Sequence, residues 1–330
     1  MANNANNRYQ GLDPDLAKEL ISYEHSYFKE DRPIPFCGLN IYPVTMHDYE
    51  KFFMCVDCFT MDKNETPQGI RMTNLDYLIS KTVEHSDLGN EWAYKFNTLL
   101  EMIFHIQNGV KCSKCGEIIP YNSQHFKDYL LQIQKLQSDT NMLDKIKKHE
   151  MDIPELPCPK CNEPVKDGVI ETKLDEKSKH YMLIVDGHII SSKDFNRLRR
   201  IVLFQNMPDY FDDSWVDKGL REDRKAKMAL EQKKNENLEA STERKIVCLS
   251  IATNYKFEEI YNMTIRKFTI ALSAVEDLIN YKIMKSAAMN GFVQLPKDQK
   301  IEHWIYKKTG DIYGDMYKDA ADVQNSINNL

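Results

Sequence analysis

Residues 111–116 read KCSKCG and residues 157–162 read PCPKCN, which places two Cys-x-x-Cys pairs near the middle of a 330-residue chain. Two residues between the cysteines let both sulfur atoms reach one face of a tight turn. The next residue often needs a left-handed backbone, which Gly116 adopts freely and Asn162 tolerates. Four thiolates from two such turns suit the tetrahedral shell of zinc, at about 2.3 Å from each sulfur. The sequence therefore predicts one structural zinc ion, Zn²⁺, bound by Cys112, Cys115, Cys158 and Cys161.

The spacing between the two pairs is unusual, because 42 residues separate Cys115 from Cys158. Common zinc ribbons have roughly 15–20 residues there. A helical pattern over 123–149 explains the difference, since a helical insertion can leave the ribbon and return to nearly the same place. A redox disulfide at either pair is the alternative. A thioredoxin-like motif is disfavoured, because neither pair lies between a clear strand and a long helix.

The sequence on either side of the cysteines is mainly helical. Asp13 or Asp15 is placed to cap a helix over 13–30. Prolines and Gly38 break the chain before a short strand at 39–44, and Asp186-Gly187 predicts a type I′ hairpin. We expect an α+β fold that is predominantly α-helical, with helical N- and C-terminal regions around a small zinc-ribbon β module. The expected parts are a disordered arm (1–12), an N-terminal mainly helical region (13–107), the zinc-ribbon β module (108–190) with its helical insertion (123–149), and a C-terminal helical region (191–330).

Composition limits the classes of function. The formal net charge is −6, which argues against bulk electrostatic attraction to nucleic acid. No apolar run approaches the roughly 20 residues that cross a bilayer, so no membrane insertion is expected. Nothing in the first residues indicates a secretory signal. Paired cysteines in a reducing compartment indicate metal or redox chemistry more often than a disulfide framework.

The remaining cysteines are expected in apolar surroundings. Cys55 and Cys58 share a face of a predicted helix with neighbouring phenylalanines, and Cys37 and Cys248 are interpreted as core residues as well. A second metal site built from Cys37, Cys55 and Cys58 with a histidine is the alternative.

Catalytic motifs are missing from the sequence. There is no phosphate-binding loop, dinucleotide fingerprint, nucleophile elbow or HExxH motif. The acids at 209, 212 and 213 could form a hydrolase dyad or a divalent-ion site, but a solvated or partner-docking loop is favoured. We expect no enzymatic activity.

Residues 253–278 have the outline of a helix–turn–helix, in which 257–260 end one helix and Ile265 begins the next. Arg266 and Lys267 are its only basic residues near the turn. This is less positive charge than a DNA-recognition helix usually carries. Packing within a helical domain is therefore favoured over DNA binding.

Four stretches carry a resemblance to a known group of proteins. They are YPVTMHDYEKFF (42–53), IVDGHIISSKDFNRLRRIVLFQNMPDY (184–210), KIVCLSIATNYKFEEIYNMTIRKF (245–268) and HWIY (303–306). Together they resemble tail-morphogenesis and baseplate-assembly proteins of tailed bacteriophages of Gram-positive hosts, over roughly 40–310. The resemblance implies a non-enzymatic assembly role and carries no catalytic residues.

The sequence thus predicts a phage tail or baseplate assembly protein that acts through contacts with other tail or baseplate proteins. Its expected location is the host cytoplasm during assembly, with retention in the virion tail left open. The alternative is a zinc-ribbon nucleic-acid-binding protein in phage transcription or genome handling. In that hypothesis Lys111, Lys114, Lys160 and Lys166 line the ribbon, and Arg197, Arg199 and Arg200 add a second patch.

Overall fold

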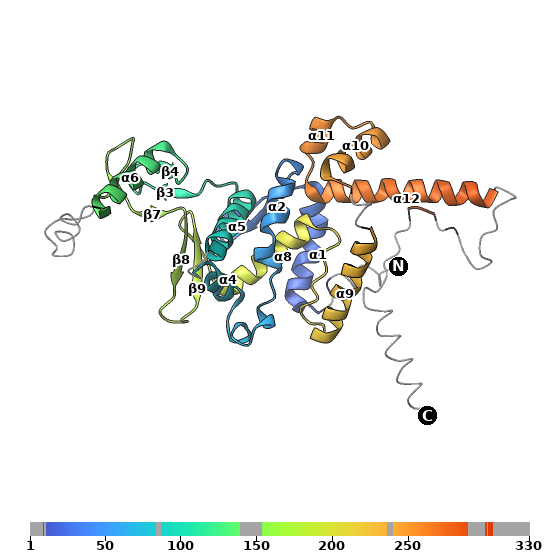
Figure 1. Cartoon of the computed structure of the whole chain (residues 1–330), viewed down its shortest axis with the longest axis horizontal. Helices are drawn as coiled ribbons and strands as arrows, with labels where there is room; N and C mark the ends of the chain where they lie inside the picture. The colour runs from blue at the N-terminus through green and yellow to red at the C-terminus, as the bar shows by residue number, and fades with distance from the viewer. Residues whose placement is uncertain are drawn as a thin grey trace, which may run out of the picture. The chain divides into compact units, whose positions relative to one another are not determined.

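The computed structural model describes residues 9, 11–83, 87–138, 154–235, 240–289, 301 and 303–305 (Figure 1). The chain forms two compact units. The first unit comprises Met1–Glu30, Thr45–His47 and Leu203–Leu330, and the second comprises Asp31–Val44 and Asp48–Val202. Helices dominate both units and the sheets are small. The predicted α+β, predominantly helical class is confirmed.

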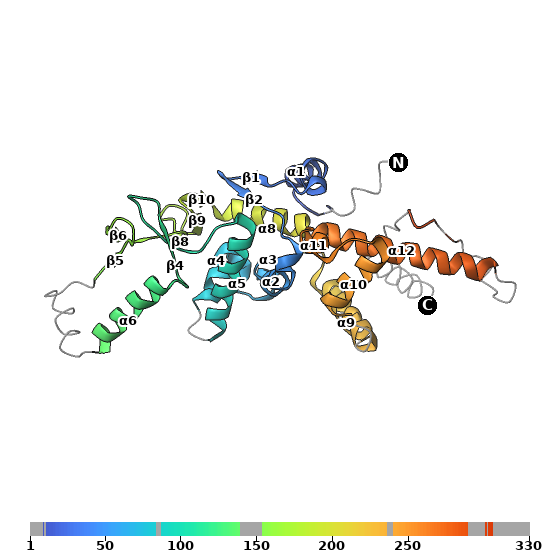
Figure 2. The same ribbon diagram turned by 90° about the horizontal axis from the view of Figure 1, so that it is seen from above.

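The second unit contains a helical core. Figure 2 shows α8 crossing over α2, α4 and α5. Phe195 of α8 lies at the centre, where its ring meets the edges of Phe59 and Phe96 at centroid distances of 5.7 and 6.0 Å. Cys55 and Cys58 are buried in the same region, as the sequence predicted. The helices are α2 (Tyr49–Cys55), α3 (Asp57–Thr60), α4 (Asn74–Thr82), α5 (Asp87–Phe104) and α8 (Ser192–Asn206).

Two hairpins accompany these helices. The first joins β1 (Ile34–Phe36) to β2 (Leu39–Ile41) through Cys37 and Gly38, where the sequence predicted a single strand at 39–44. The extra strand forms because both turn residues take positive φ values, of 48° and 82°. Cys37 is therefore a half-buried turn residue and not the core residue that the sequence suggested.

The second hairpin belongs to a three-stranded antiparallel sheet. The strands are β8 (Ile170–Leu174), β9 (Tyr181–Val185) and β10 (His188–Ile190), in the order β10-β9-β8. Asp186 and Gly187 join β9 to β10 with positive φ values of 48° and 81°, which confirms the type I′ turn. The sheet lies beside α4 (Figure 1). The Ser191 hydroxyl then caps α8 by accepting from the Asp194 amide at 3.1 Å.

The first unit is helical. Asp13 caps α1 (Pro14–Ser26) as predicted, accepting from the amides of residues 15 and 16. Tyr9 falls within the arm expected at 1–12, yet it is buried with its ring 5.0 Å from that of Phe204. Residues 1–8 and 10 of that arm lie outside the described residues. The other helices are α9 (Lys218–Asn235), α10 (Thr242–Thr253), α11 (Phe257–Tyr261) and α12 (Ile265–Met289).

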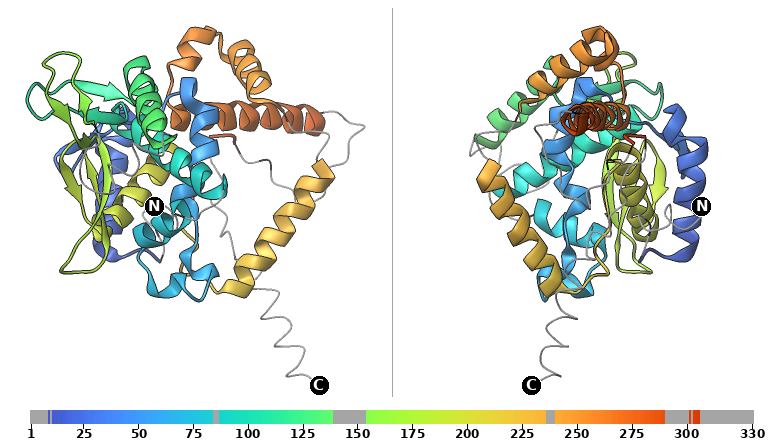
Figure 3. Two further views of the ribbon diagram at one scale, coloured as in Figure 1. Left: turned by 60° about the vertical axis from the view of Figure 1, so that its left-hand side comes forward. Right: turned by 90° about the vertical axis from the view of Figure 1, so that its right-hand side faces the viewer.

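The end of this unit has the expected helix–turn–helix outline, since α11 ends at Tyr261 and α12 begins at Ile265. Figure 3 shows α10 and α11 against the first half of α12. Arg266 is 6% exposed, and its guanidinium donates to the Phe204 carbonyl at 3.0 Å and to Glu24 at 2.9 Å. Arg266 therefore anchors α12 in its own unit, and helix packing explains this segment better than DNA recognition.

Short 3₁₀ helices complete the description: η2 (Phe28–Glu30), η3 (Met46–Asp48), η4 (Lys63–Glu65) and η5 (Gly69–Arg71). Within the residues that the structure describes, no helix combines the length and apolar composition needed to cross a membrane.

Candidate metal centre

The first cysteine pair occupies the turn between β3 (Gly109–Lys111) and β4 (Ile118–Pro120). The carbonyl of Cys112 accepts from the amide of Gly116 at 2.9 Å, and the amide of Cys112 donates to the Glu117 carbonyl at 2.8 Å. Gly116 has φ +74°, so the left-handed residue that the sequence predicted is present. These bonds curl the backbone around the two sulfurs.

The second pair repeats this turn between β5 (Leu156–Pro157) and β6 (Pro164–Val165). The Cys158 carbonyl accepts from the Asn162 amide at 2.8 Å, and the Cys158 amide donates to the Glu163 carbonyl at 2.8 Å. Asn162 has φ +59°. The two turns, here called knuckles and defined as residues 112–117 and 158–163, therefore share one backbone pattern.

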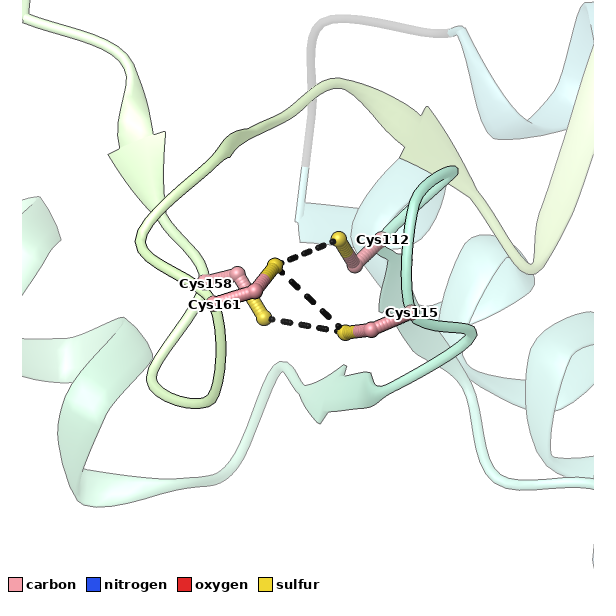
Figure 4. Close-up of side chains that lie close together, drawn as sticks. All are labelled: Cys112, Cys115, Cys158 and Cys161. Atoms are coloured by element: carbon pink, nitrogen blue, oxygen red, sulfur yellow. Dashed lines mark hydrogen bonds between the residues drawn. The ribbon is translucent and has the colours of Figure 1, made fainter.

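All four sulfurs converge between the knuckles (Figure 4). Their ligand atoms lie within 4.8 Å of one another. Cys112 and Cys161 approach to 3.5 Å between sulfurs, and Cys115 lies 3.5 Å from Cys158 and 3.6 Å from Cys161. A tetrahedron with bonds of about 2.3 Å has sulfurs about 3.8 Å apart, whereas a disulfide needs about 2.05 Å. The spacing fits a metal such as zinc. All four cysteines are free, so the disulfide alternative at either pair is not formed in this structure.

Electrostatics inside the cluster also favour a cation. The backbone amides of Cys115 and Lys114 lower the pKa of Cys112 to about 7 against desolvation. The Glu163 amide lowers the pKa of Cys161, but desolvation and the neighbouring thiols outweigh it and raise the value to about 12. Four thiolates cannot share this space without compensation, and a divalent ion supplies the positive charge that deprotonates coordinating thiols.

A small apolar core supports the knuckles. Cys112 and Cys158 are 1% and 2% exposed and pack with Ile119, Leu156 and Val165. Further contacts come from α6 (Gln124–Ser138), which occupies the first part of the predicted insertion; residues 139–149 lie outside the described residues.

Helix α6 is tied directly to the second knuckle. His125 Nε2 donates to the carbonyl of Pro157 at 2.7 Å, and Phe126 and Tyr129 pack on the apolar core. The insertion therefore holds the second knuckle beside the first, which explains how a spacing of 43 positions between Cys115 and Cys158 still gives one cluster.

The four ribbon lysines named in the nucleic-acid hypothesis, at positions 111, 114, 160 and 166, are each paired with an acid. Lys114 of the first knuckle pairs with Glu163 of the second, and Lys160 of the second pairs with Glu117 of the first at 3.7 Å. The sulfur contacts are reciprocal in the same way, so a pseudo-twofold relation connects the knuckles. The other two pairs are Lys111 with Asp186 and Lys166 with Glu155.

The arginines of the expected basic patch are engaged as well. Arg199 donates to the carbonyls of Phe59 and Met61 at 2.7 and 3.2 Å, which fastens α8 to the end of α3. Arg197 pairs with Asp194 at 3.4 Å. Neither side chain is presented to a partner as an unpaired charge.

Other candidates from the sequence do not assemble into sites. Within the described residues, the four-cysteine cluster is the only group of three or more His, Cys, Asp or Glu side chains close enough to hold a metal. The alternative site at Cys37, Cys55 and Cys58 is therefore not formed. Cys248, expected in the core, is exposed, because it lies on the outer face of α10.

Two acids of the acidic loop make contacts within their own unit. Asp212 is 6% exposed and accepts from the Ser214 amide at 3.1 Å, while Asp213 pairs with Arg224 at 3.4 Å.

One polar arrangement was missed by the sequence reasoning. His180 Nδ1 lies 2.7 Å from Asp76, beside a cleft in the second unit. The two residues are 104 positions apart, and the only local signal is the capping sequence Thr73-x-x-Asp76 at the start of α4.

Comparison with known proteins gives one match. Residues 232–309 match the family model described as YomV second domain, a phage-associated family. The match includes α10, α11 and α12. No curated protein and no solved structure matches the chain. The chain thus combines a segment similar to a phage-associated domain with a four-cysteine cluster able to hold a metal.

Proposed function

We propose that this chain is a non-enzymatic phage protein of tail or baseplate assembly that acts through protein–protein contacts. The observation that carries the proposal is the match of residues 232–309 to a phage-associated domain. The sequence resemblance to tail-morphogenesis proteins supports the more specific role in tail or baseplate assembly. Its expected partners are tail or baseplate proteins, met in the infected cell while tails assemble.

Zinc has a structural role in this proposal. Cys112, Cys115, Cys158 and Cys161 would complete a four-thiolate shell, which leaves no position for a water molecule or substrate. The ion supplies positive charge and cross-links the two knuckles. This chain's own residues then keep the shell closed, since α6 and the reciprocal Lys–Glu pairs hold the knuckles together.

The charges of the ribbon support protein contacts over nucleic-acid contacts. Binding to phosphates depends on lysines and arginines that release counterions. Each of the four ribbon lysines already has an acidic partner, and the guanidinium of Arg199 donates hydrogen bonds to backbone carbonyls. We expect no DNA affinity that falls steeply with salt.

Inactivation of the gene in the phage that carries it tests the proposal. A stop codon early in the reading frame, examined by electron microscopy of infected cells, should give DNA-filled heads without complete tails. Complementation by the wild-type chain and by Cys248→Ser should restore tails, because Cys248 is exposed and is not a member of the four-cysteine cluster. Complete tailed virions from the stop mutant, or a block in phage DNA replication or transcription, would refute the tail assignment.

A further inference from the structure

A cleft of about 640 Å³ lies in the second unit, where the turn before α4 meets the hairpin of β8 and β9. Its volume falls in the range of about 300–1,000 Å³ that is typical of ligand sites. One wall is formed by Arg71 and by residues of α4, and the other by Lys179, His180 and Tyr181. The cleft belongs to no motif that the sequence displays.

Asp76 fixes the two walls to each other and is fully engaged in doing so. One carboxylate oxygen accepts from the Tyr181 amide at 2.8 Å. The other accepts from His180 Nδ1 at 2.7 Å and from the Thr73 amide at 3.1 Å. Burial raises the pKa of Asp76, but these hydrogen bonds outweigh it and lower the pKa below its usual value. Asp76 is therefore a fixed carboxylate that holds the cleft in shape.

His180 is oriented by this contact. Because an ionised carboxylate only accepts hydrogen bonds, Nδ1 of His180 carries the proton that Asp76 receives. Nε2 is left without a hydrogen-bond partner among the described residues. His180 lines the cleft together with Arg71 and Lys179.

The two cations of the cleft differ from those of the ribbon. Arg71 and Lys179 are exposed, and no carboxylate of the described chain pairs with either. By contrast, Lys173 on the same hairpin pairs with Glu171 at 2.7 Å, and the ribbon lysines are paired too. The carboxylate of Asp76 accepts hydrogen bonds from the Thr73 and Tyr181 amides and from His180, and it pairs with neither Arg71 nor Lys179. The cleft therefore presents two positive charges without a carboxylate partner in the described chain.

The remaining walls indicate which anion fits. Met72, Ile79 and Val83 line the cleft with apolar surface, so the ligand needs an apolar body next to its acid. A phosphate is disfavoured, because the Thr73–Asp76 capping box already bonds amides at the start of α4 and Asp76 would repel a dianion. A singly charged carboxylate beside an apolar side chain matches these features.

We propose that this cleft binds an acidic peptide segment of a partner protein, with a carboxylate against Arg71 and Lys179 and an apolar or aromatic side chain against Met72 and Val83. The inference rests on the proposed function, because it specifies the chemistry of one protein–protein contact. Charge complementarity selects the occupant, since Arg71 and Lys179 border the cleft without a carboxylate partner among the described residues, whereas Lys173 on the same hairpin and the four ribbon lysines are paired with acids.

The test uses the full chain and an array of heptapeptides that set Asp and Glu beside Leu, Phe, Tyr or Trp in every order. Each peptide is paired with its Asn/Gln counterpart, and the strongest binder is titrated by fluorescence anisotropy. The cleft variant is Arg71→Gln with Lys179→Asn. Asn suits the left-handed backbone of position 179, where φ is 56°. The control is Lys193→Gln with Lys177→Asn, which removes the same charge from exposed positions that do not line the cleft.

We expect acidic peptides to bind at least tenfold more tightly than their amide counterparts. The cleft variant should lose at least tenfold in affinity, while the control stays within twofold. Arg71→Gln alone, which leaves the turn at 179 unchanged, should lose at least threefold.

Equal binding of acid and amide peptides, no peptide binding at all, or equal losses in the cleft variant and the control would each overturn the inference. So would a labelled 20-nucleotide single strand of DNA that binds the wild type but not the cleft variant. Tailless heads from the stop mutant would still support the role in tail assembly, even if the peptide inference failed. The two proposals can therefore be refuted separately.

Discussion

Replacing Cys158 by serine is the most direct test of the metal centre. The sulfur of Cys158 is buried and lies 3.5 Å from that of Cys115. Serine keeps the size of the side chain but removes one thiolate from the shell. A structural zinc site contributes about 10–16 kcal/mol at neutral pH. Each of the three buried aliphatic side chains beside it, Ile119, Leu156 and Val165, contributes only about 1.5–3 kcal/mol.

A zinc ion in the cluster would therefore be the dominant stabilising contribution within the ribbon, and its loss should unfold the ribbon locally. The loss of global stability is smaller than the metal's full contribution. Once the ribbon has unfolded locally, a further loss of metal affinity no longer changes the stability of the helical core around Phe195. We expect hydrogen exchange in 109–120 and 156–165 to accelerate at least 100-fold, or about 2.8 kcal/mol, with little change in α4, α5 and α8.

The assay combines zinc content by elemental analysis with hydrogen-exchange mass spectrometry. Wild-type protein and Cys248→Ser should each contain one zinc per chain, and Cys158→Ser should contain less than a fifth of that. Removing zinc from the wild type with a chelator should reproduce the exchange pattern of Cys158→Ser. Cys158→Ser with full zinc content, or metal-free wild type with an unchanged ribbon, would refute the reasoning.

Three further predictions concern the anchor of α12, the start of α4 and the turn between β9 and β10. Arg266→Met should lower the free energy of unfolding by about 2–4 kcal/mol in urea titrations, because it leaves Glu24 and a buried carbonyl without their cation; an unchanged midpoint would contradict this anchor. Asp76→Asn should cost about 1–2 kcal/mol near neutral pH. Since the pKa of Asp76 is lowered from 3.8, its contribution is complete above that value and lost as the pH falls through the lower folded pKa. The difference in melting temperature between wild type and variant should therefore shrink below about pH 4, and a constant difference would count against it. Gly187→Ala should cost about 1–2 kcal/mol because φ is 81°, whereas Gly187→Asn should be nearly neutral in the same thermal melts.

The knuckles and turns were predictable because their signals are local. Two residues between cysteines, a following Gly116 or Asn162, and the dipeptide at 186–187 specify backbone geometry by themselves. The helical insertion was likewise visible as a periodic pattern. These elements account for how the four sulfurs come to lie within 4.8 Å.

What the sequence did not reveal depends on partners far along the chain. The sequence favoured helix packing around Arg266 but could not name its partners, which lie 62 and 242 positions away along the chain. Cys248 looked apolar by its neighbours, yet its face of α10 is exposed. The contact between Asp76 and His180 follows from packing of the β8–β9 hairpin against α4, which periodicity cannot specify.

The reciprocal pairing of the knuckles also bears on self-association. Lys114 would meet Glu163, and Cys112 would meet Cys161, equally well if the two knuckles came from different chains. Pairing within one chain is favoured only because the connecting segment keeps the second knuckle at a high effective concentration near the first. For short flexible linkers this effective concentration is of millimolar order. The connection between Cys115 and Cys158 spans 43 positions, although α6 shortens its reach. Zinc added to unfolded chains at high protein concentration should therefore yield exchanged dimers, whereas zinc added at high dilution should yield monomers.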